Sequence, residues 1–166
     1  REQHMIERPV ALERGLHDLH LRRVAELEQA HRHRRGDPLV GLARRDRGRE
    51  DCLRRLAALQ DTPDAFCTTY EEVCYQPPEW WQERLRSNTG TTLLAVDDED
   101  AGMAAVYGAK DDPSVTWLCS VWVAPSHRGR GVGDALMAAS IKHARTLGVS
   151  RLMLEVAETN LPAQAL

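Results

Sequence analysis

The part of the chain that decides the fold lies at residues 121–134 and reads VWVAPSHRGRGVGD. A strand rich in β-branched and aromatic residues is expected to end at Val123, and a helix is expected to begin near Gly133. Between them, Gly129, Gly131 and Gly133 stand at alternate positions. Glycine allows a positive φ and lets a ligand approach the backbone closely. The stretch therefore predicts a strand, a ligand-binding loop and a helix in succession.

The residue types of this loop favour a phosphate as the ligand. Amides at a helix N-terminus carry about half a positive charge, and Arg128 and Arg130 add two more charges. The common nucleotide loops do not fit. The Walker A pattern needs a Lys after its glycines, and none follows here. The dinucleotide pattern needs a third glycine where this chain has Asp134 or Leu136.

Hydrophobic patterning around the loop predicts an α/β fold with a mixed sheet. Strands are expected at 91–96, 103–107, 115–123 and 150–156, and helices at 49–59, 68–75, 79–87, 134–147 and from 160 onward. Gly148 should end the helix that follows the loop, and Leu136, Ser140, Ala144 and Leu147 should share its inward face. The order from residue 91 combines hairpins with one crossover, which is typical of a mixed sheet.

Residues 1–49 differ from the rest of the chain because they are dense in Arg and His. Leucine spacing predicts a helix over Pro9–Ala30, and the arginine clusters at 32–49 indicate a loop or linker. Residues Pro38–Leu42 are the only weak strand candidate there. We therefore expect an Arg/His-rich N-terminal extension over 1–49, helical or partly disordered, and a folded domain over 50–166.

The composition of the 166-residue chain indicates one globular domain. The net charge of -3 gives no general attraction to nucleic acid or membrane. Neither a membrane-spanning run nor a secretory signal is found, so a cytoplasmic location is expected. The cysteines form no Cys-x-x-Cys pair, and the histidine spacings match no recognised site, so no metal is expected. The thiols should be reduced and mostly buried.

Arg128, Gly131 and Gly133 form the pattern Arg-x-x-Gly-x-Gly, which resembles the pyrophosphate loop of the GNAT superfamily of acyl-CoA N-acyltransferases. The preceding Val121–Pro125 and the later Leu154–Ala163 also look like that family. The resemblance covers about residues 50–166. It implies a GNAT-like mixed, mostly antiparallel sheet with flanking helices and a splayed parallel strand pair, and acetyl-CoA as the co-substrate.

The resemblance also implies where the co-substrate lies. In the family, the strand before the loop carries a bulge and splays from the next parallel strand, and pantetheine pairs with its backbone in the gap. The matching segments are Cys119–Val123 and Leu152–Val156. A backbone amide near Val121 would polarise the thioester carbonyl. The residues implied to bind the cofactor are Val121, Trp122, Val123, Arg128, Gly129, Arg130, Gly131, Val132, Gly133, Asp134 and Asn160.

The implied reaction is direct attack of a neutral amine on acetyl-CoA, with a general base to take the proton. Glu155 is the first candidate for that base, and a solvated Glu at a strand end is an equal alternative. Glu71 and Glu72 are weaker candidates, and Cys119 is interpreted as a packing residue. The tyrosine acid usual in the family would fall immediately after Leu166. The sequence is therefore interpreted as lacking the C-terminal part of the domain.

The predicted function is an N-acetyltransferase that acts on a primary amine of a small molecule or peptide. The alternative is a non-catalytic acyl-CoA-binding or regulatory GNAT-like module. Neither a nucleic acid nor a membrane is expected as a partner, and a homodimer is left open. Acidic residues such as Glu71, Glu72 and Asp111 weakly favour a cationic acceptor.

Overall fold

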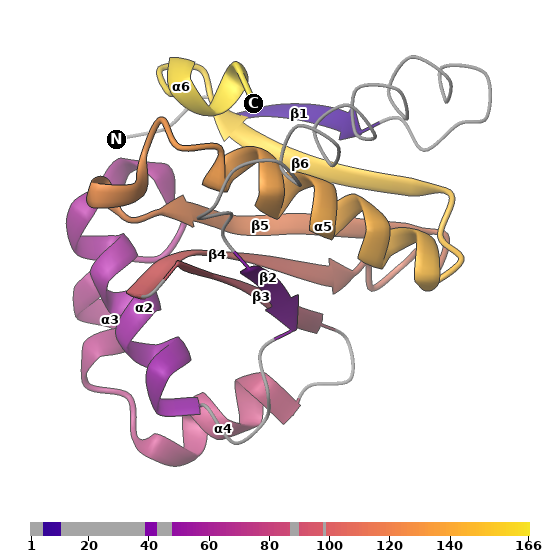
Figure 1. Cartoon of the computed structure of the whole chain (residues 1–166). Helices are drawn as coiled ribbons and strands as arrows, with labels where there is room; N and C mark the ends of the chain where they lie inside the picture. Colours follow the sequence, from indigo (N-terminus) through magenta and orange to yellow (C-terminus); the bar gives the residue numbers. More distant parts are fainter. Residues whose placement is uncertain (1–4, 11–38, 43–47, 87–89, 98) are drawn as a thin grey trace.

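The computed structural model describes residues 5–10, 39–42, 48–86, 90–97 and 99–166 (Figure 1). The described strands form one sheet in the order β1-β6-β5-β4-β3-β2. Only the β5–β6 pair among them is parallel, so the sheet is mixed and mostly antiparallel. The strands are β1 (Met5–Val10), β2 (Leu39–Leu42), β3 (Gly90–Asp97), β4 (Glu99–Gly108), β5 (Val115–Val123) and β6 (Arg151–Ala157).

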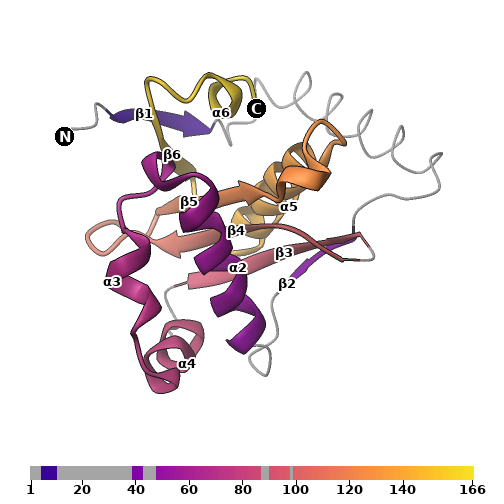
Figure 2. The ribbon, with the colours of Figure 1, turned by 90° about the vertical axis from the view of Figure 1, so that its left-hand side faces the viewer.

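Helices cover both faces of this sheet (Figures 1 and 2). Helix α5 packs on one face, and α2, α3 and α4 lie on the other. Short 3-10 turns at Pro63–Ala65 and Pro125–His127 follow α2 and β5. The helix bounds are α2 (Gly48–Asp61), α3 (Tyr70–Cys74), α4 (Pro78–Arg86), α5 (Val132–Thr146) and α6 (Leu161–Gln164).

The larger core lies between α5 and the sheet. Leu136, Ser140 and Ala144 are fully buried there, as the spacing predicted. The Ser140 hydroxyl donates to the carbonyl of Leu136 at 2.8 Å, which satisfies it inside the helix. Leu147 was wrongly expected to face inward and is 53% exposed. The helix has already ended at Thr146, and Gly148 follows with a φ of 71°.

A second core joins α2 to the opposite face of the sheet. Ala58 packs there with Leu94, Met103 and Trp122. Next to it, Leu59, Val73 and Trp81 hold α2, α3 and α4 together. Leu53, which the leucine spacing of this helix places on its apolar side, is 57% exposed. Cys52, Leu56 and Leu59 lie on the side of the helix that packs inward.

The first 49 residues contain two strands of the sheet, which corrects the interpretation of this segment. β1 pairs antiparallel with β6, and β2 pairs antiparallel with β3. Residues 39–42 confirm the weak strand candidate. Pro9 and Val10 lie in β1 rather than in a helix, and residues 11–38 of the predicted helix and linker lie outside the described residues. β1 combines adjacent charges with a proline and lies at a sheet edge, where proline is tolerated. The division at residue 49 stays a prediction.

None of the four cysteines forms a disulfide, and none of them is buried. The expectation of mostly buried thiols was therefore wrong: Cys67 and Cys119 are exposed. Within the described ranges, no group of three or more His, Cys, Asp or Glu side chains is placed to hold a metal ion. The helices of the described part are all too short or too polar to cross a membrane.

Candidate active site

The strand that precedes the glycine loop carries a bulge. Ala105 of β4 pairs with Cys119, and Met103 pairs with Trp122, so β5 has one residue more than β4 between these pairs. The extra residue forces Ser120 to a φ of 57°, an uncommon value for a residue other than glycine. Arg55 of α2 donates to the Ser120 hydroxyl at 2.8 Å. Backbone groups that would otherwise pair within the sheet are thereby redirected at this point.

The two parallel strands separate beside the bulge. β5 and β6 pair from Val115 with Arg151 to Leu118 with Leu154, and no further pair follows. Cys119–Val123 and Glu155–Ala157 therefore face a gap in the sheet. The expected bulge and splay are both present, but Leu152–Leu154 still belong to the paired part of β6. On β6, the gap therefore begins at Glu155, the residue after the last pair.

The glycine loop leads into α5 with unpaired amides at its start. Gly129 and Gly131 have φ values of 69° and 81°, and Gly131 is the N-terminal cap of the helix. The first intrahelical bond runs from the Ala135 amide to the Gly131 carbonyl at 3.0 Å, so the amides of residues 132–134 precede it. A Cβ on Gly129 would meet nothing within 4 Å, which leaves the loop open to a ligand. Amides at a helix N-terminus suit a phosphate group, and binding of a pyrophosphate here stays a prediction.

The third glycine has a different neighbour. A Cβ on Gly133 would lie 3.0 Å from side-chain carbons of Leu166, the residue that closely follows α6. Gly133 therefore lets α6 approach the start of α5. The sequence predicted that Gly133 contacts the ligand. Because Leu166 occupies the space beside its Cα, only the backbone amide of Gly133 is available for that contact.

Arg128 is held by the protein rather than projecting into the loop. Its Nε donates to the Val123 carbonyl at 3.1 Å, and its guanidinium forms an ion pair with Asp61 at the end of α2. Asp61 also accepts a hydrogen bond from the Trp122 indole at 2.8 Å. One carboxylate thus links α2, β5 and the loop. The contact of Arg128 with phosphate stays a prediction.

The sequence did not reveal this function of Asp61. Its partners lie 61 and 67 residues away, and no local pattern links them.

We expect Asp61→Ala to weaken acetyl-CoA binding about tenfold and to lower the melting temperature. The Trp122 indole and Arg128 would lose their shared acceptor, which costs about 1–3 kcal/mol when a charged partner is removed. Calorimetry with acetyl-CoA and thermal unfolding measure the two effects. Glu83→Gln is the matched control, because Glu83 is an exposed acid on α4 remote from the loop. Unchanged affinity in Asp61→Ala would remove this residue from the site.

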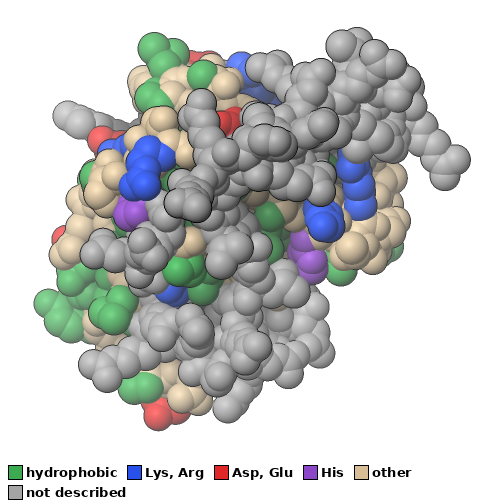
Figure 3. Space-filling view, in the orientation of Figure 1, with side chains coloured by type: hydrophobic (Ala, Val, Ile, Leu, Met, Phe, Trp, Pro, Cys, Tyr) green, Lys and Arg blue, Asp and Glu red, His purple; other side chains and the backbone are tan. Residues whose placement is uncertain are grey.

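Arg130 and Asn160 occupy different surroundings. Arg130 is exposed on the loop, and basic side chains gather over this region on the face in Figure 3. Asn160 caps α6, because its side-chain oxygen accepts from the Ala163 amide at 3.2 Å. The Asn160 position beyond β6 agrees with the expected one, and its contact with a cofactor stays a prediction.

Glu155 stands where the gap opens. It is exposed and directly follows Leu154, the last residue of β6 that pairs with β5. Across the other edge of β6 it pairs with Glu7 of β1, so two carboxylates lie on one face of the sheet. Glu71 and Glu72 lie in α3, where the Glu72 carboxylate accepts from the Thr69 amide at 2.8 Å and caps the helix. Glu72 is therefore engaged in the helix cap, and the role of Glu155 as a base stays a prediction.

Comparison with known sequences bears on this geometry. Residues 54–166 match the model of the acetyltransferase (GNAT) family. The chain is 40% identical over 74 residues to the streptothricin acetyltransferase of Streptomyces lavendulae, which covers 43% of this chain and 39% of that protein. It is 35% identical over 81 residues to the mycothiol acetyltransferase of Kocuria rhizophila, which covers 45% and 27%. The chain spans less than half the length of these curated relatives.

Solved structures share the fold. An aminoglycoside acetyltransferase from an uncultured soil metagenomic sample, in complex with sisomicin, superimposes with a TM-score of 0.65 and 11% identity over 77% of this chain and 83% of that chain. An acetyltransferase from Streptococcus pneumoniae superimposes with a TM-score of 0.65 and 20% identity over 77% of this chain and 80% of that chain. A predicted acetyltransferase from Clostridium acetobutylicum, solved with acetyl-CoA, superimposes with a TM-score of 0.58 and 12% identity over 77% of this chain and 86% of that chain. These likenesses confirm the predicted sheet architecture.

Proposed function

Because the chain belongs to the acetyltransferase (GNAT) family, we propose that it transfers the acetyl group of acetyl-CoA directly to a primary amine of a small molecule or peptide. The observation that carries this proposal is the juxtaposition of a bulged strand, a gap in the sheet and a loop whose amides at residues 132–134 precede the first intrahelical bond of α5. These are the features that an extended acyl-CoA needs: an edge for its pantetheine and a cradle for its pyrophosphate.

The residues that would hold acetyl-CoA lie along one continuous path. The amides from Gly129 to Asp134 would bind the pyrophosphate, with Arg130 supplying charge. The edge of β5 from Cys119 to Val123 would pair with the pantetheine, and an amide near Val121 would donate to the thioester oxygen. Trp122 would act through its backbone, since its side chain is buried against α2.

The transfer replaces the carbon–sulfur bond of the thioester by a carbon–nitrogen bond. The amine nitrogen bonds to the acetyl carbon, the carbon–sulfur bond breaks, and the proton that the nitrogen then loses passes through water to the sulfur, which leaves as the thiol of CoA. The ammonium form of the acceptor must first lose a proton, which we assign to Glu155 directly or through water. No covalent acetyl-enzyme is needed, so Cys119 has no nucleophilic role in this proposal.

Two measurements test the proposal. Calorimetry of the chain with acetyl-CoA should show binding, and thiol release with a panel of primary amines should show turnover. Absence of acetyl-CoA binding would overturn the assignment of the loop. Binding without turnover by any amine would instead favour the alternative of a non-catalytic acyl-CoA-binding module.

A further inference from the structure

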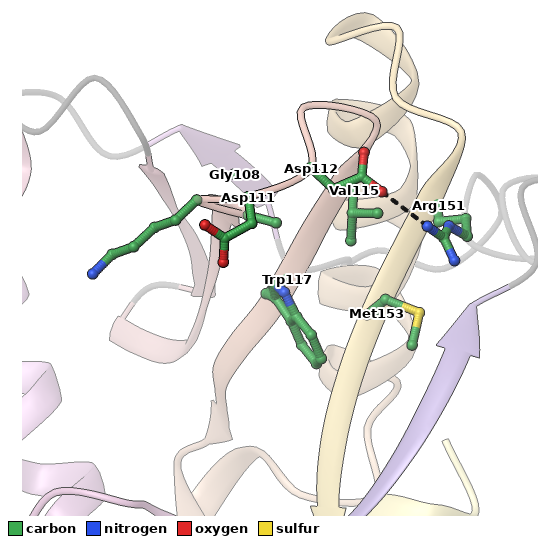
Figure 4. Close-up of a pocket in the computed structure, with 9 residues that line it drawn as sticks. Gly108, Asp111, Asp112, Val115, Trp117, Arg151 and Met153 are labelled. Atoms are coloured by element: carbon green, nitrogen blue, oxygen red, sulfur yellow. Dashed lines mark hydrogen bonds and ion pairs between the residues drawn. The ribbon is translucent and has the colours of Figure 1, made fainter.

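A hollow of about 500 Å³ opens at the paired end of β5 and β6 (Figure 4). This volume falls in the range of small-molecule sites, which is about 300–1,000 Å³. The hollow lies at the opposite end of the β5–β6 pair from the glycine loop, beside the turn that joins β4 to β5. Its principal lining residues are Lys110, Asp111, Asp112, Trp117, Arg151 and Met153.

The floor of the hollow leads to the gap in the sheet. Trp117 and Met153 pair in register across β5 and β6, and Figure 4 shows their side chains next to each other. Successive side chains alternate between faces, so Glu155 lies on the same face as Met153. Leu152 and Leu154 face α5 instead. A molecule seated on the floor can thus extend along this face to Glu155.

The acidic groups of this path differ in what they already bind. Asp112 accepts hydrogen bonds from the Ser114 hydroxyl at 2.6 Å and from the Ser114 amide at 2.9 Å, and it pairs with Arg151 at 3.0 Å. The Ser114 hydrogen bonds hold the pKa of Asp112 below its ordinary value, so it remains a carboxylate committed to these partners.

Three other carboxylates lie along the path. Asp111 stands at the rim of the hollow above the Trp117 indole, and Glu155 and Glu7 stand at its far end. None of these three carboxylates forms a hydrogen bond or ion pair with another described residue. Among the cationic side chains that line the hollow, Lys110 also lacks such a partner, whereas Arg151 pairs with Asp112. Three carboxylates against one ammonium attract positive charge at both ends of the path. The indole face between them also attracts cations and packs against alkyl groups.

We propose that this hollow is the acceptor site and that it binds a compound with two amines, one held at Asp111 and the other placed at Glu155 for acetylation. The inference rests on the proposed acetyl transfer and adds the class of acceptor. Met153 and Arg151, which line the hollow, lie two and four residues from Glu155 along β6, which is roughly 7 Å and roughly 13 Å. An acceptor that lies in the hollow and reaches Glu155 should therefore have its two nitrogens separated by about this range, with an uncharged alkyl or ring portion over Trp117.

Binding tests the site without requiring turnover. Calorimetry should show that diaminoheptane binds the chain more tightly than heptylamine or the shorter diaminopropane. Asp111→Asn should weaken diaminoheptane about fivefold, the size of one partly exposed ion pair, and leave heptylamine unchanged. Lys110→Gln should strengthen diaminoheptane, because it removes the opposing charge. Both positions lie on the surface, so neither change threatens the fold. Glu158→Gln, at an exposed acid past the end of β6, is the matched control.

The kinetic measurement separates this inference from the proposed function. In acetylation assays, kcat/KM for diaminoheptane should exceed that for heptylamine, and the difference should disappear in Asp111→Asn and shrink at high salt. Acetylation of both amines with equal kcat/KM would overturn the acceptor site and leave the proposed function intact. Diamine binding that depends on Asp111 without any acetylation would support the site and overturn the proposed function. Equal binding of both amines by the chain would overturn the inference in either case.

Discussion

Replacing Gly131 by glutamate is expected to abolish acetyl-CoA binding. The residue has a φ of 81°, where a side chain costs about 1–2 kcal/mol. Its carboxylate would stand at the start of α5, accept from the amides meant for phosphate and repel the pyrophosphate. Two like charges roughly 4 Å apart near a protein surface repel by about 4 kcal/mol. The strain lowers stability, whereas the repulsion alone predicts a loss of affinity of about a thousandfold, measured by calorimetry.

The matched control for Gly131→Glu is Gly148→Glu. Gly148 also has a left-handed φ, of 71°, and stands just past the other end of the same helix, with open space where a side chain would go. The variant carries the same strain and the same added charge, and α5 places it far from the loop. It should lose stability on thermal unfolding and keep its affinity for acetyl-CoA. If both variants bind acetyl-CoA as the unchanged chain does, the loop is not the pyrophosphate site.

Replacing Glu155 by glutamine is expected to lower kcat about 100-fold at neutral pH, with the KM for acetyl-CoA unchanged. Glutamine keeps the shape of the side chain but accepts no proton, and general-base catalysis contributes about 100-fold or more. The defect should shrink as the pH approaches the pKa of the acceptor ammonium, because the amine then deprotonates without help. Thiol release measured across a pH series gives both results.

Two comparison variants isolate the role of Glu155. Glu158→Gln changes an exposed acid three residues later and should have full activity. Glu7→Gln removes the opposite carboxylate on β1 and should raise the KM of a cationic acceptor rather than lower kcat. If Glu155→Gln is as active as the unchanged chain at every pH, Glu155 is a solvated residue at a strand end.

Local chemistry explains what the sequence predicted well. β5 begins and ends at the predicted residues, because its β-branched and aromatic run is bounded by a turn and by Pro125. The helix after the loop was expected from Asp134 and begins at Val132, since Gly131 rather than Gly133 is its cap. The loop and the strand before it, which carry most of the proposed site, thus depend on adjacent residues. This is the information that a sequence contains most directly.

Contacts between distant residues explain the rest. Asp61 gains its function from partners on β5 and the loop that only the folded chain brings near it. β1 offers no period-two alternation and acquires its identity as a strand by pairing with β6. Arg128 fits a phosphate-binding pattern, yet in the folded chain it forms an ion pair with Asp61. Sequence reasoning therefore located the bulged strand and the loop but not the side chains that support them.

The carboxylate of Asp61 couples α2, on one face of the sheet, to the loop that leads into α5, on the other face. It ends α2, and through Trp122 and Arg128 it fixes the loop that leads to α5. Any molecule whose binding shifts α2 would change the affinity of the loop for its ligand, and by reciprocity that ligand would change the affinity for the molecule by the same factor. Asp61→Ala should remove this dependence.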